Sequence, residues 1–203
     1  MTENTIDNNT NHNNRGAETS PPMDPRDLVR ISRRLSLVLR HRPESIGVTL
    51  DSAGWVAVDE LLAALAAHGT RISRAGLDAV VAGNDKSRFA FDPAGTRIRA
   101  SQGHTVPVEL GYAPVPPPAV LYHGTVAASL DSIFRTGLRP GRRHDVHLSA
   151  DRPTAQKVGA RRGRPVVLAV DAPRMAADGH EFRRSANGVW LTAAVPAEYL
   201  RLL

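Results

Sequence analysis

Clusters of arginine and histidine stand out in this chain because their side chains are suited to holding a phosphate. Arg40, His41 and Arg42 directly follow an apolar stretch, at the expected end of a helix. Cations near a helix C-terminus interact favourably with its negative end in any case, so this cluster alone has an ordinary structural explanation. A phosphate there would be held by side chains alone, and the planar fork of arginine matches it well. Arg88, which opens a predicted hairpin, is a second cation that could contact a phosphate.

Two stretches of the second half combine similar residue types with predicted strands. His123-Gly124-Thr125 follows a short apolar run, and its glycine would let a ligand approach the backbone closely. A plain strand-to-helix turn capped by Thr125 explains the same tripeptide. The segment 142–149 (RRHDVHLS) places an arginine pair before a strand, and its two histidines are three residues apart. No cysteine and no further His or Glu completes a ligand set there, so we predict no metal site.

Composition narrows the function classes. The 203 residues contain no cysteine, which excludes disulfides and thiolate metal sites, and they carry a formal net charge of +6, which favours a polyanionic partner. Sequence motifs for a dinucleotide-binding Rossmann turn, a P-loop, a nucleophile elbow or a zinc protease are missing. No apolar run approaches the roughly 18 residues of a membrane span, and the N-terminus lacks a secretory signal. We therefore expect a cytoplasmic protein that does not contact a membrane.

Hydrophobic periodicity predicts three helices followed by a hairpin in the first half, the pattern of a winged helix. The predicted elements are helices over Asp27–His41, Asp59–His68 and Ser73–Gly83 and strands over Arg88–Phe91 and Thr96–Ala100.

The second half has a different pattern, with many short strands and few helices, which is typical of a compact α+β domain around a sheet. We expect strands over Val120–Tyr122, Val146–Ser149, Val166–Val170 and Val189–Val195, a helix ending at Gly137, and a helix from Asp151 to about Arg162.

Composition shifts suggest how the chain divides. Residues 1–25 form an Asn-rich polar segment closed by prolines, with little to bury, and we expect it to be disordered. Four prolines within 114–118 predict a stiff linker. The two lobes would then span residues 26–113 and 119–203.

Taken together, the motifs resemble one family, the RNA 2'-phosphotransferases known from tRNA splicing and RNA repair. In the first lobe the similar stretches are Leu35–Pro43 (LSLVLRHRP), Gly54–Val56 with Asp59–Leu62, Asn84–Phe89 and Ile98–His104. In the second lobe they are Leu121–Thr125 (LYHGT), Ser132–Ile133 with Gly137–Leu138, Arg143–Ser149 and Asn187–Thr192 (NGVWLT). Each motif is modest, but they follow one another in the family's order from about Leu28 to the C-terminus.

The resemblance implies an α+β protein in which a winged-helix lobe binds RNA and a C-terminal ADP-ribosyltransferase-like lobe binds NAD. It implies that an internal RNA 2'-phosphate attacks the NAD ribose and expels nicotinamide. The ribose 2''-hydroxyl of this ADP-ribosylated intermediate then attacks the phosphate, giving 2'-OH RNA and ADP-ribose 1'',2''-cyclic phosphate. The positions that match the family's catalytic tetrad are Arg40, His41, Arg88 and Arg143. Those that match the NAD site are His123, Gly124, Thr125, Ser132, His147, Leu148 and Ser149.

The chemistry suits these residue types. A phosphate is already anionic, so the first step needs alignment by guanidinium groups rather than a base. His41 is the tetrad member that titrates near neutrality, and we expect it to transfer a proton in the second step. We expect a monomer that consumes NAD, acts on RNA carrying a 2'-phosphate and needs no metal, with its site between the lobes.

One departure and three alternatives stay open. The family's His-Val-His-Leu stretch reads Asp145 to Leu148 here, and this carboxylate could pair with an arginine and weaken phosphate binding, or point outward. The protein could instead ADP-ribosylate terminal phosphates of RNA or DNA. Protein mono-ADP-ribosylation is disfavoured because Asn187–Thr192 contains no Glu. A winged-helix nucleic-acid binder with an inert second domain is disfavoured because the tetrad and the NAD-site positions are all present.

Overall fold

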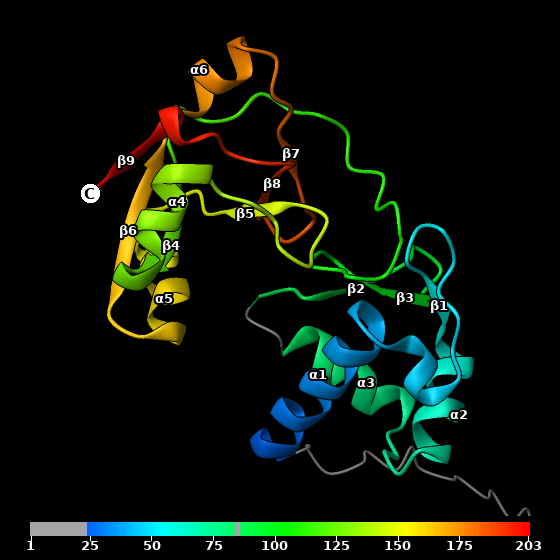
Figure 1. The fold of residues 1–203 in the computed structure, drawn as a ribbon. Coiled ribbons are helices and arrows are strands. Elements are labelled where there is room, and N and C mark those ends of the chain that lie inside the picture. The colour runs from blue at the N-terminus through cyan, green and yellow to red at the C-terminus, as the bar shows by residue number, and fades with distance from the viewer. Residues whose placement is uncertain (1–23, 84–85) are drawn as a thin grey trace, which may run out of the picture.

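The computed structural model describes residues 24–83 and 86–203, and these build two separate hydrophobic cores. The first core uses residues between 31 and 100, and the second uses residues between 121 and 199. Figure 1 shows helices α1, α2 and α3 gathered beside one small sheet, and the other helices and strands in a second group. Most of the predicted disordered tail, 1–23, lies outside the described residues, as do Asn84 and Asp85. Pro25 was assigned to that tail, but it begins the first helix.

Helix α1 (Pro25–Arg40) confirms the first predicted helix and ends at the basic cluster. Asp24 caps its start, because the carboxylate accepts a hydrogen bond from the Arg26 N–H at 2.7 Å. Its inner stripe is fully enclosed by the first core. A 3-10 turn, η1 (Pro43–Ile46), follows immediately and turns the chain away. Arg40 and His41 therefore lie at a helix end whose direction is fixed by packing.

The remaining elements of the first group also agree with the sequence, apart from one two-residue strand. They are β1 (Val56–Ala57), α2 (Val58–Ala67), α3 (Arg74–Ala82), β2 (Phe89–Phe91) and β3 (Arg97–Ala100). Ser73 caps α3 as predicted, accepting from the Gly76 N–H at 3.1 Å. The strands form an antiparallel sheet in the order β1-β3-β2. Sequence inspection missed β1 because a two-residue strand carries no periodic signal.

The second group consists of two antiparallel sheets with three helices. One sheet has the order β4-β6-β9 and the other has the order β5-β8-β7. The strands are β4 (Leu121–Val126), β5 (Val146–Leu148), β6 (Pro165–Val170), β7 (Arg183–Arg184), β8 (Trp190–Thr192) and β9 (Leu200–Leu202). The helices are α4 (Leu130–Thr136), α5 (Arg152–Gly159) and α6 (Ala172–Ala177), with 3-10 turns η2 (Ala127–Ser129), η3 (Ala160–Arg162) and η4 (Ala197–Tyr199). With the first sheet, these elements make the chain an α+β protein.

Strand β4 corrects one local prediction. It runs on through His123, Gly124 and Thr125, which pair with Leu168, Val167 and Val166 of β6. The alternative of a strand-to-helix turn capped by Thr125 is therefore wrong. The tripeptide is the continuation of strand β4, so its side chains alternate between the two faces of the sheet.

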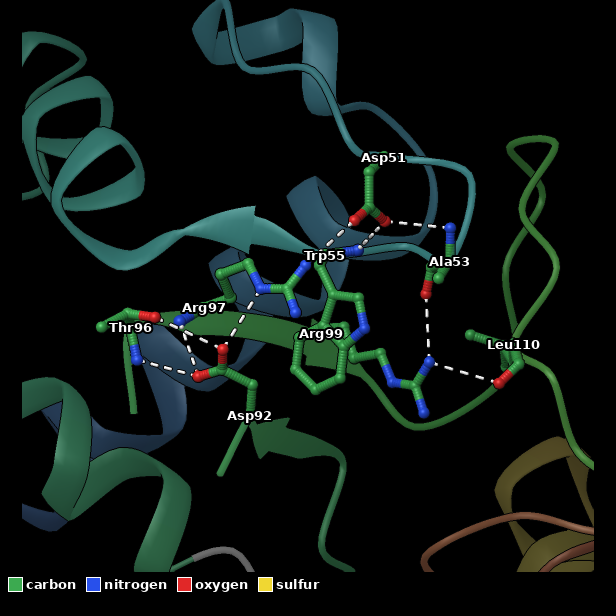
Figure 2. Close-up of polar contacts among 8 residues, drawn as sticks. All are labelled: Asp51, Ala53, Trp55, Asp92, Thr96, Arg97, Arg99 and Leu110. Carbon is green, nitrogen blue, oxygen red and sulfur yellow. Dashed lines mark hydrogen bonds and ion pairs between the residues drawn. The ribbon is translucent and has the colours of Figure 1, made fainter. Parts of the chain in front are cut away.

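The segment between β3 and β4 is held at several points along its length. Figure 2 shows Arg99 reaching from β3 to the carbonyl oxygens of Ala53 and Leu110, each 3.2 Å from Nη1, and its guanidinium lies 4.4 Å from the Trp55 ring centroid. Tyr112 donates its hydroxyl to the Ser101 carbonyl at 2.8 Å. These contacts fix the stretch 101–112, which faces the second group of elements.

The proline-rich stretch 114–118 also makes backbone contacts. Pro114 forms an isolated bridge with Arg183, and the Val115 N–H donates to the Phe182 carbonyl at 2.8 Å. The start of the proline-rich stretch thus lies along β7. The lobe boundaries at residues 113 and 119 stay a prediction.

Candidate functional site

Side chains from both groups of elements meet around Gly103. A Cβ placed on this residue would lie 3.9 Å from Nη1 of Arg40, 4.0 Å from Nε of Arg143 and 3.5 Å from Cε1 of His147. Gly103 has a φ of +87°, a conformation that favours glycine, so the backbone can pass between these side chains. Arg40 comes from the end of α1, whereas Arg143 and His147 come from β5 and the loop before it. Residues that are about a hundred positions apart in sequence thus form one basic cluster.

Arg88 joins this cluster through its backbone and its charge. The Arg40 Nη2 group donates to the Arg88 carbonyl at 3.3 Å. Burial, followed by the charges of Arg88 and Arg143, lowers the pKa of Arg40 from its ordinary value to about 10. The Nε of Arg40 is buried and has no hydrogen-bond partner within the described part of the chain. Neighbouring guanidiniums, one of which has a buried donor without a partner among the described residues, are a suitable environment for an anion.

His41, the fourth member of the predicted tetrad, is positioned by a residue that sequence analysis did not single out. Its Nδ1 lies 3.1 Å from the hydroxyl of Thr105. That hydroxyl also donates to the Arg40 carbonyl at 3.4 Å, and the Thr105 N–H donates to the same carbonyl at 2.8 Å. Since the hydroxyl proton is directed at the carbonyl, Thr105 is best placed to accept from Nδ1–H, which leaves Nε2 as the acceptor. Burial, then Arg40, lowers the pKa of His41 below 6.5, which favours this neutral form.

A cavity of about 430 Å³ adjoins the cluster and is lined by five of the seven residues expected to bind NAD. These are His123, Gly124, Thr125, Ser132 and His147. Leu148 does not line it, because its side chain is 1% exposed and belongs to the second core. Ser149 exchanges two backbone hydrogen bonds with Tyr122, at 2.8 and 2.9 Å, and is not part of the lining either. These two residues hold β5 against β4 and thereby place His147.

The cavity is strongly basic, which the sequence indicated only in part. Arg139, Arg143, Arg161 and Arg162 all contribute to its lining. Burial, followed by Arg162 and Arg161, lowers the pKa of Arg143. The 3-10 turn η3 brings Arg161 and Arg162 to the edge of the cavity. A ligand with a pyrophosphate would suit this charge distribution.

The two histidines of the cavity are linked through the backbone. His123 donates from Nδ1 to the His147 carbonyl at 3.3 Å. Arg143 donates from Nη1 to Nδ1 of His147 at 3.2 Å, which requires that nitrogen to be unprotonated. Burial, then Arg143 and Arg40, lowers the pKa of His147 to about 3. His147 is therefore a neutral group between the cluster and the cavity.

Packing alone requires a glycine at position 124, whether or not a ligand binds beside it. A Cβ at this position would lie 1.8 Å from the Ala155 carbonyl oxygen and 2.8 Å from the Gly159 nitrogen, both on α5. Glycine lets the backbone of β4 touch the backbone of α5, a contact that a sequence pattern cannot show.

Asp145, the departure from the family pattern, does not pair with Arg143. Its carboxylate lies 2.8 Å from Arg183 Nη2, and the two side chains are only 16% and 32% exposed. Arg183 on β7 thus compensates the charge of Asp145. The carboxylate thus pairs with an arginine, as one of the two expectations had it, but this arginine is Arg183 and not a member of the cluster around Gly103.

Gly103 and the neighbouring His104 also line a second cavity of about 310 Å³. His104 is 3% exposed, and neither ring nitrogen has a hydrogen-bond partner among residues 24–83 and 86–203. Burial, then Arg40, lowers its pKa to about 4. The sequence contained His104 at the end of a family motif but gave no reason to assign it a role.

Within the part of the chain that the structure describes, no three His, Asp or Glu side chains are grouped so that they could bind a metal ion. None of its described helices combines the length and the apolar character that crossing a membrane requires.

Along most of its length, the chain is similar to one family of proteins. The sequence model of the RNA 2'-phosphotransferase, Tpt1 / KptA family matches residues 26–194. A "Probable RNA 2'-phosphotransferase" from Streptomyces griseus is 59% identical over 187 residues, covering 89% of this chain and 99% of that protein. Proteins of the same description from Streptomyces coelicolor and Agrobacterium fabrum are 60% and 59% identical, covering 88% and 83% of this chain and 97% and 91% of their own.

Proposed function

Because the chain belongs to the RNA 2'-phosphotransferase, Tpt1 / KptA family, we propose that it moves an internal RNA 2'-phosphate onto NAD at the cluster around Gly103. The observation that carries this proposal is the meeting of Arg40, His41 and Arg143 next to His147, which also lines the basic cavity. In this view the 2'-phosphate lies in the cluster and NAD lies in the cavity. The three-helix group would be a winged-helix lobe, and the second group an ADP-ribosyltransferase-like lobe.

The cavity and the residues that line it fit NAD in size and in charge. Arg139, Arg161 and Arg162 can neutralise the pyrophosphate, and His123 and Thr125 offer polar groups to a ribose. When bound, NAD supplies an electrophilic ribose carbon and a nicotinamide leaving group. The protein needs to orient that carbon toward the cluster and keep water away from it.

The cluster's own chemistry is alignment and charge stabilisation. Arg40, Arg88 and Arg143 would hold the phosphate oxygens, and the partial burial of Arg40 strengthens its charge-assisted hydrogen bonds. His41, neutral and with Nδ1 bonded to Thr105, can accept a proton at Nε2 from a hydroxyl that attacks the phosphate.

We would test the proposal with a short RNA carrying one internal 2'-phosphate, incubated with and without NAD and resolved by charge and mass. The expected result is NAD-dependent loss of the phosphate together with ADP-ribose cyclic phosphate. Arg143→Ala should lower the rate by about 100-fold or more, because removal of one preorganised charge from such a site commonly costs that much. Arg135→Ala removes the same charge from the exposed side of α4 and should match the wild type. RNA that binds but stays unchanged with NAD present would contradict the proposal.

A further inference from the structure

Arg99 joins strand β3 to the stretch 101–112, the segment that carries Thr105 into the site. Its Nη1 group donates to the carbonyl oxygens of Ala53 and Leu110, both at 3.2 Å (Figure 2). The Nε of Arg99 is buried, without a hydrogen-bond partner among the described residues. One half-buried guanidinium therefore ties the far end of the stretch to the turn that precedes β1.

Further contacts hold the same turn against the stretch. The Glu109 N–H donates to the Ser52 carbonyl at 2.7 Å. A Cβ placed on Gly54 would lie 3.6 Å from Nε2 of His104 and 3.8 Å from Cβ of Val108, which is van der Waals contact. The stretch therefore packs directly on this turn, and the guanidinium described above is bonded to both segments.

On its side toward the second group of elements, the stretch is less well packed. The cavity of about 310 Å³ lies there, between the stretch and residues that include Asp145, Arg183 and Leu191. Atoms that line a void lack neighbours on one side, so less packing opposes their movement into it. The ring nitrogens of His104 make no hydrogen bond to the described part of the chain that would hold the stretch in place. Its position therefore depends on contacts with the first group, including those of Arg99.

Thr105 transmits the position of the stretch to His41. Its N–H is bonded to the Arg40 carbonyl at 2.8 Å, but the bond of its hydroxyl to the same carbonyl is long, at 3.4 Å. A displacement of about 1 Å would break this long bond. The hydroxyl would then be free to donate to Nδ1 of His41, and the imidazole proton would move to Nε2.

We propose that Arg99 is a positioning residue of the site, which holds the stretch 101–112 so that Thr105 accepts from Nδ1 of His41 and Nε2 stays free for proton transfer. The proposal rests on the function proposed above, because a free Nε2 serves the second step of that reaction. A merely structural role would lower stability without changing the His41 tautomer or the rate of the folded enzyme.

Arg97 offers a matched control on the same strand. Its side chain leaves the same face of β3, and its guanidinium lies 5.4 Å from the Trp55 ring centroid, compared with 4.4 Å for Arg99. Within the described part of the chain, its side-chain ion pairs are with Asp92 at 3.2 Å and Asp51 at 3.5 Å (Figure 2). Arg97→Met and Arg99→Met therefore remove the same charge beside the same ring, but only the second releases the stretch.

The first experiment observes His41 in the ligand-free protein. The histidines are labelled with 15N, the ring nitrogens are recorded by NMR at pH 8, and the signals lost in His41→Asn assign this residue. The wild type and Arg97→Met should show a proton on Nδ1, whereas Arg99→Met should shift the equilibrium toward the tautomer protonated at Nε2. Arg99→Lys retains the charge but is one bond shorter, and should give an intermediate ratio.

The second experiment measures turnover of 2'-phosphorylated RNA with NAD. Arg99→Met should lower kcat about tenfold and leave KM within about twofold, because misorientation of a proton-transfer group affects the rate and not the binding of substrate. Arg97→Met should match the wild type. The double variant Arg99→Met with Thr105→Val should be no slower than Thr105→Val alone, because Arg99 acts through this hydroxyl.

The outcomes separate this proposal from the proposed function. Equal tautomer ratios or equal rates for Arg97→Met and Arg99→Met would overturn the assignment, as would multiplied effects in the double variant. If Arg99→Met does not fold, Arg99→Lys is compared with Arg97→Lys, and equal tautomer ratios for these two overturn it in the same way. A wild type without NAD-dependent turnover would contradict the activity, and the tautomer comparison would still decide whether Arg99 positions His41.

Discussion

At the residue scale, the site depends on histidines that are kept neutral by burial and by neighbouring guanidiniums. His41, His104 and His147 all have a lowered pKa, and in each case burial is the largest cause. A neutral imidazole can accept a proton or a hydrogen bond where a cationic one would only repel the arginines. Thr105 matters because it decides which nitrogen of His41 is free.

Thr105→Val should slow the proton-transfer step about tenfold, because Nδ1 of His41 then loses its acceptor and the tautomer with a free Nε2 is no longer favoured. Single-turnover experiments that follow both the substrate and ADP-ribosylated RNA would show this intermediate accumulating. Thr105→Ser keeps the hydroxyl and should restore the rate. A variant lacking the hydroxyl with wild-type kinetics and an unchanged pH–rate profile would refute the assignment.

His104 should make the fold sensitive to mild acid. Its pKa is about 4 in the folded chain and near 6.5 when unfolded, so between these values the unfolded state binds more protons. Stability must then fall as pH drops from about 6.5 to 4, by about 3 kcal/mol if this histidine acts alone. Urea unfolding at pH 7, 5.5 and 4.5 measures the loss. His104→Leu should flatten the curve in part, whereas substitution of the exposed His68 by Asn should leave its slope as in the wild type.

Most of the residues brought together at the site could be named from the sequence, because resemblance to a family identifies motifs wherever they fold. Sequence reasoning could not find Thr105 or the cavity role of Arg161 and Arg162, since these act through tertiary contacts and follow no local pattern. Nor could it find that Asp145 pairs with Arg183, because the partner lies 38 positions away and on a different strand.

At the scale of elements, strand β4 and helix α5 are joined without side chains between them. Gly124 and Gly159 bring the two backbones together, and the neighbouring His123 and Thr125 take their position from this contact. The cavity wall is thus set by a helix–strand contact that admits no larger residue.

Gly124→Ala should destabilise the second core by about 3 kcal/mol or more, because the new methyl group would meet the Ala155 carbonyl and backbone atoms cannot move aside cheaply. Gly47→Ala is the control. Its Cβ would meet nothing within 4 Å, so only the φ of +73° matters, at about 1 kcal/mol. Guanidinium unfolding followed by tryptophan fluorescence would measure both losses. Equal losses for the two variants would contradict a packing origin.

The regular elements were predictable where a periodic pattern is long enough. Helices α1, α2 and α3, and the hairpin β2–β3, appear within one or two residues of the expected bounds. The missed helices and strands are β1, α6, β7 and β9, which have six residues or fewer and are stabilised by partners distant in sequence. Strand β4 was predicted too short at its C-terminal end. Its glycine, Gly124, is a poor strand former, and the strand is stabilised there by the packing of α5 in the folded protein.

At the scale of the whole molecule, the two groups of elements both contribute side chains to one site. Arg40, His41 and Arg88 come from the first group and Arg143 and His147 from the second, and the stretch 101–112 lies between them. Asn187 adds a contact near this junction by donating to the Lys86 carbonyl at 2.8 Å. Chemistry at the cluster therefore depends on how the two groups are held together.

Dense positive charge around Gly103 has a consequence for evolution. Arg40, Arg88 and Arg143 carry like charges that repel one another, and this repulsion contributes, after burial, to the lowered pKa of Arg40. Selection for catalysis and selection for stability then act in opposite directions at the same positions.

Arg143→Gln should melt at a higher temperature than the wild type in phosphate-free buffer, while millimolar inorganic phosphate should raise the Tm of the wild type more than that of the variant. Lineages that abandon the reaction would be expected to lose these arginines early, because catalysis would no longer offset the cost of their mutual repulsion.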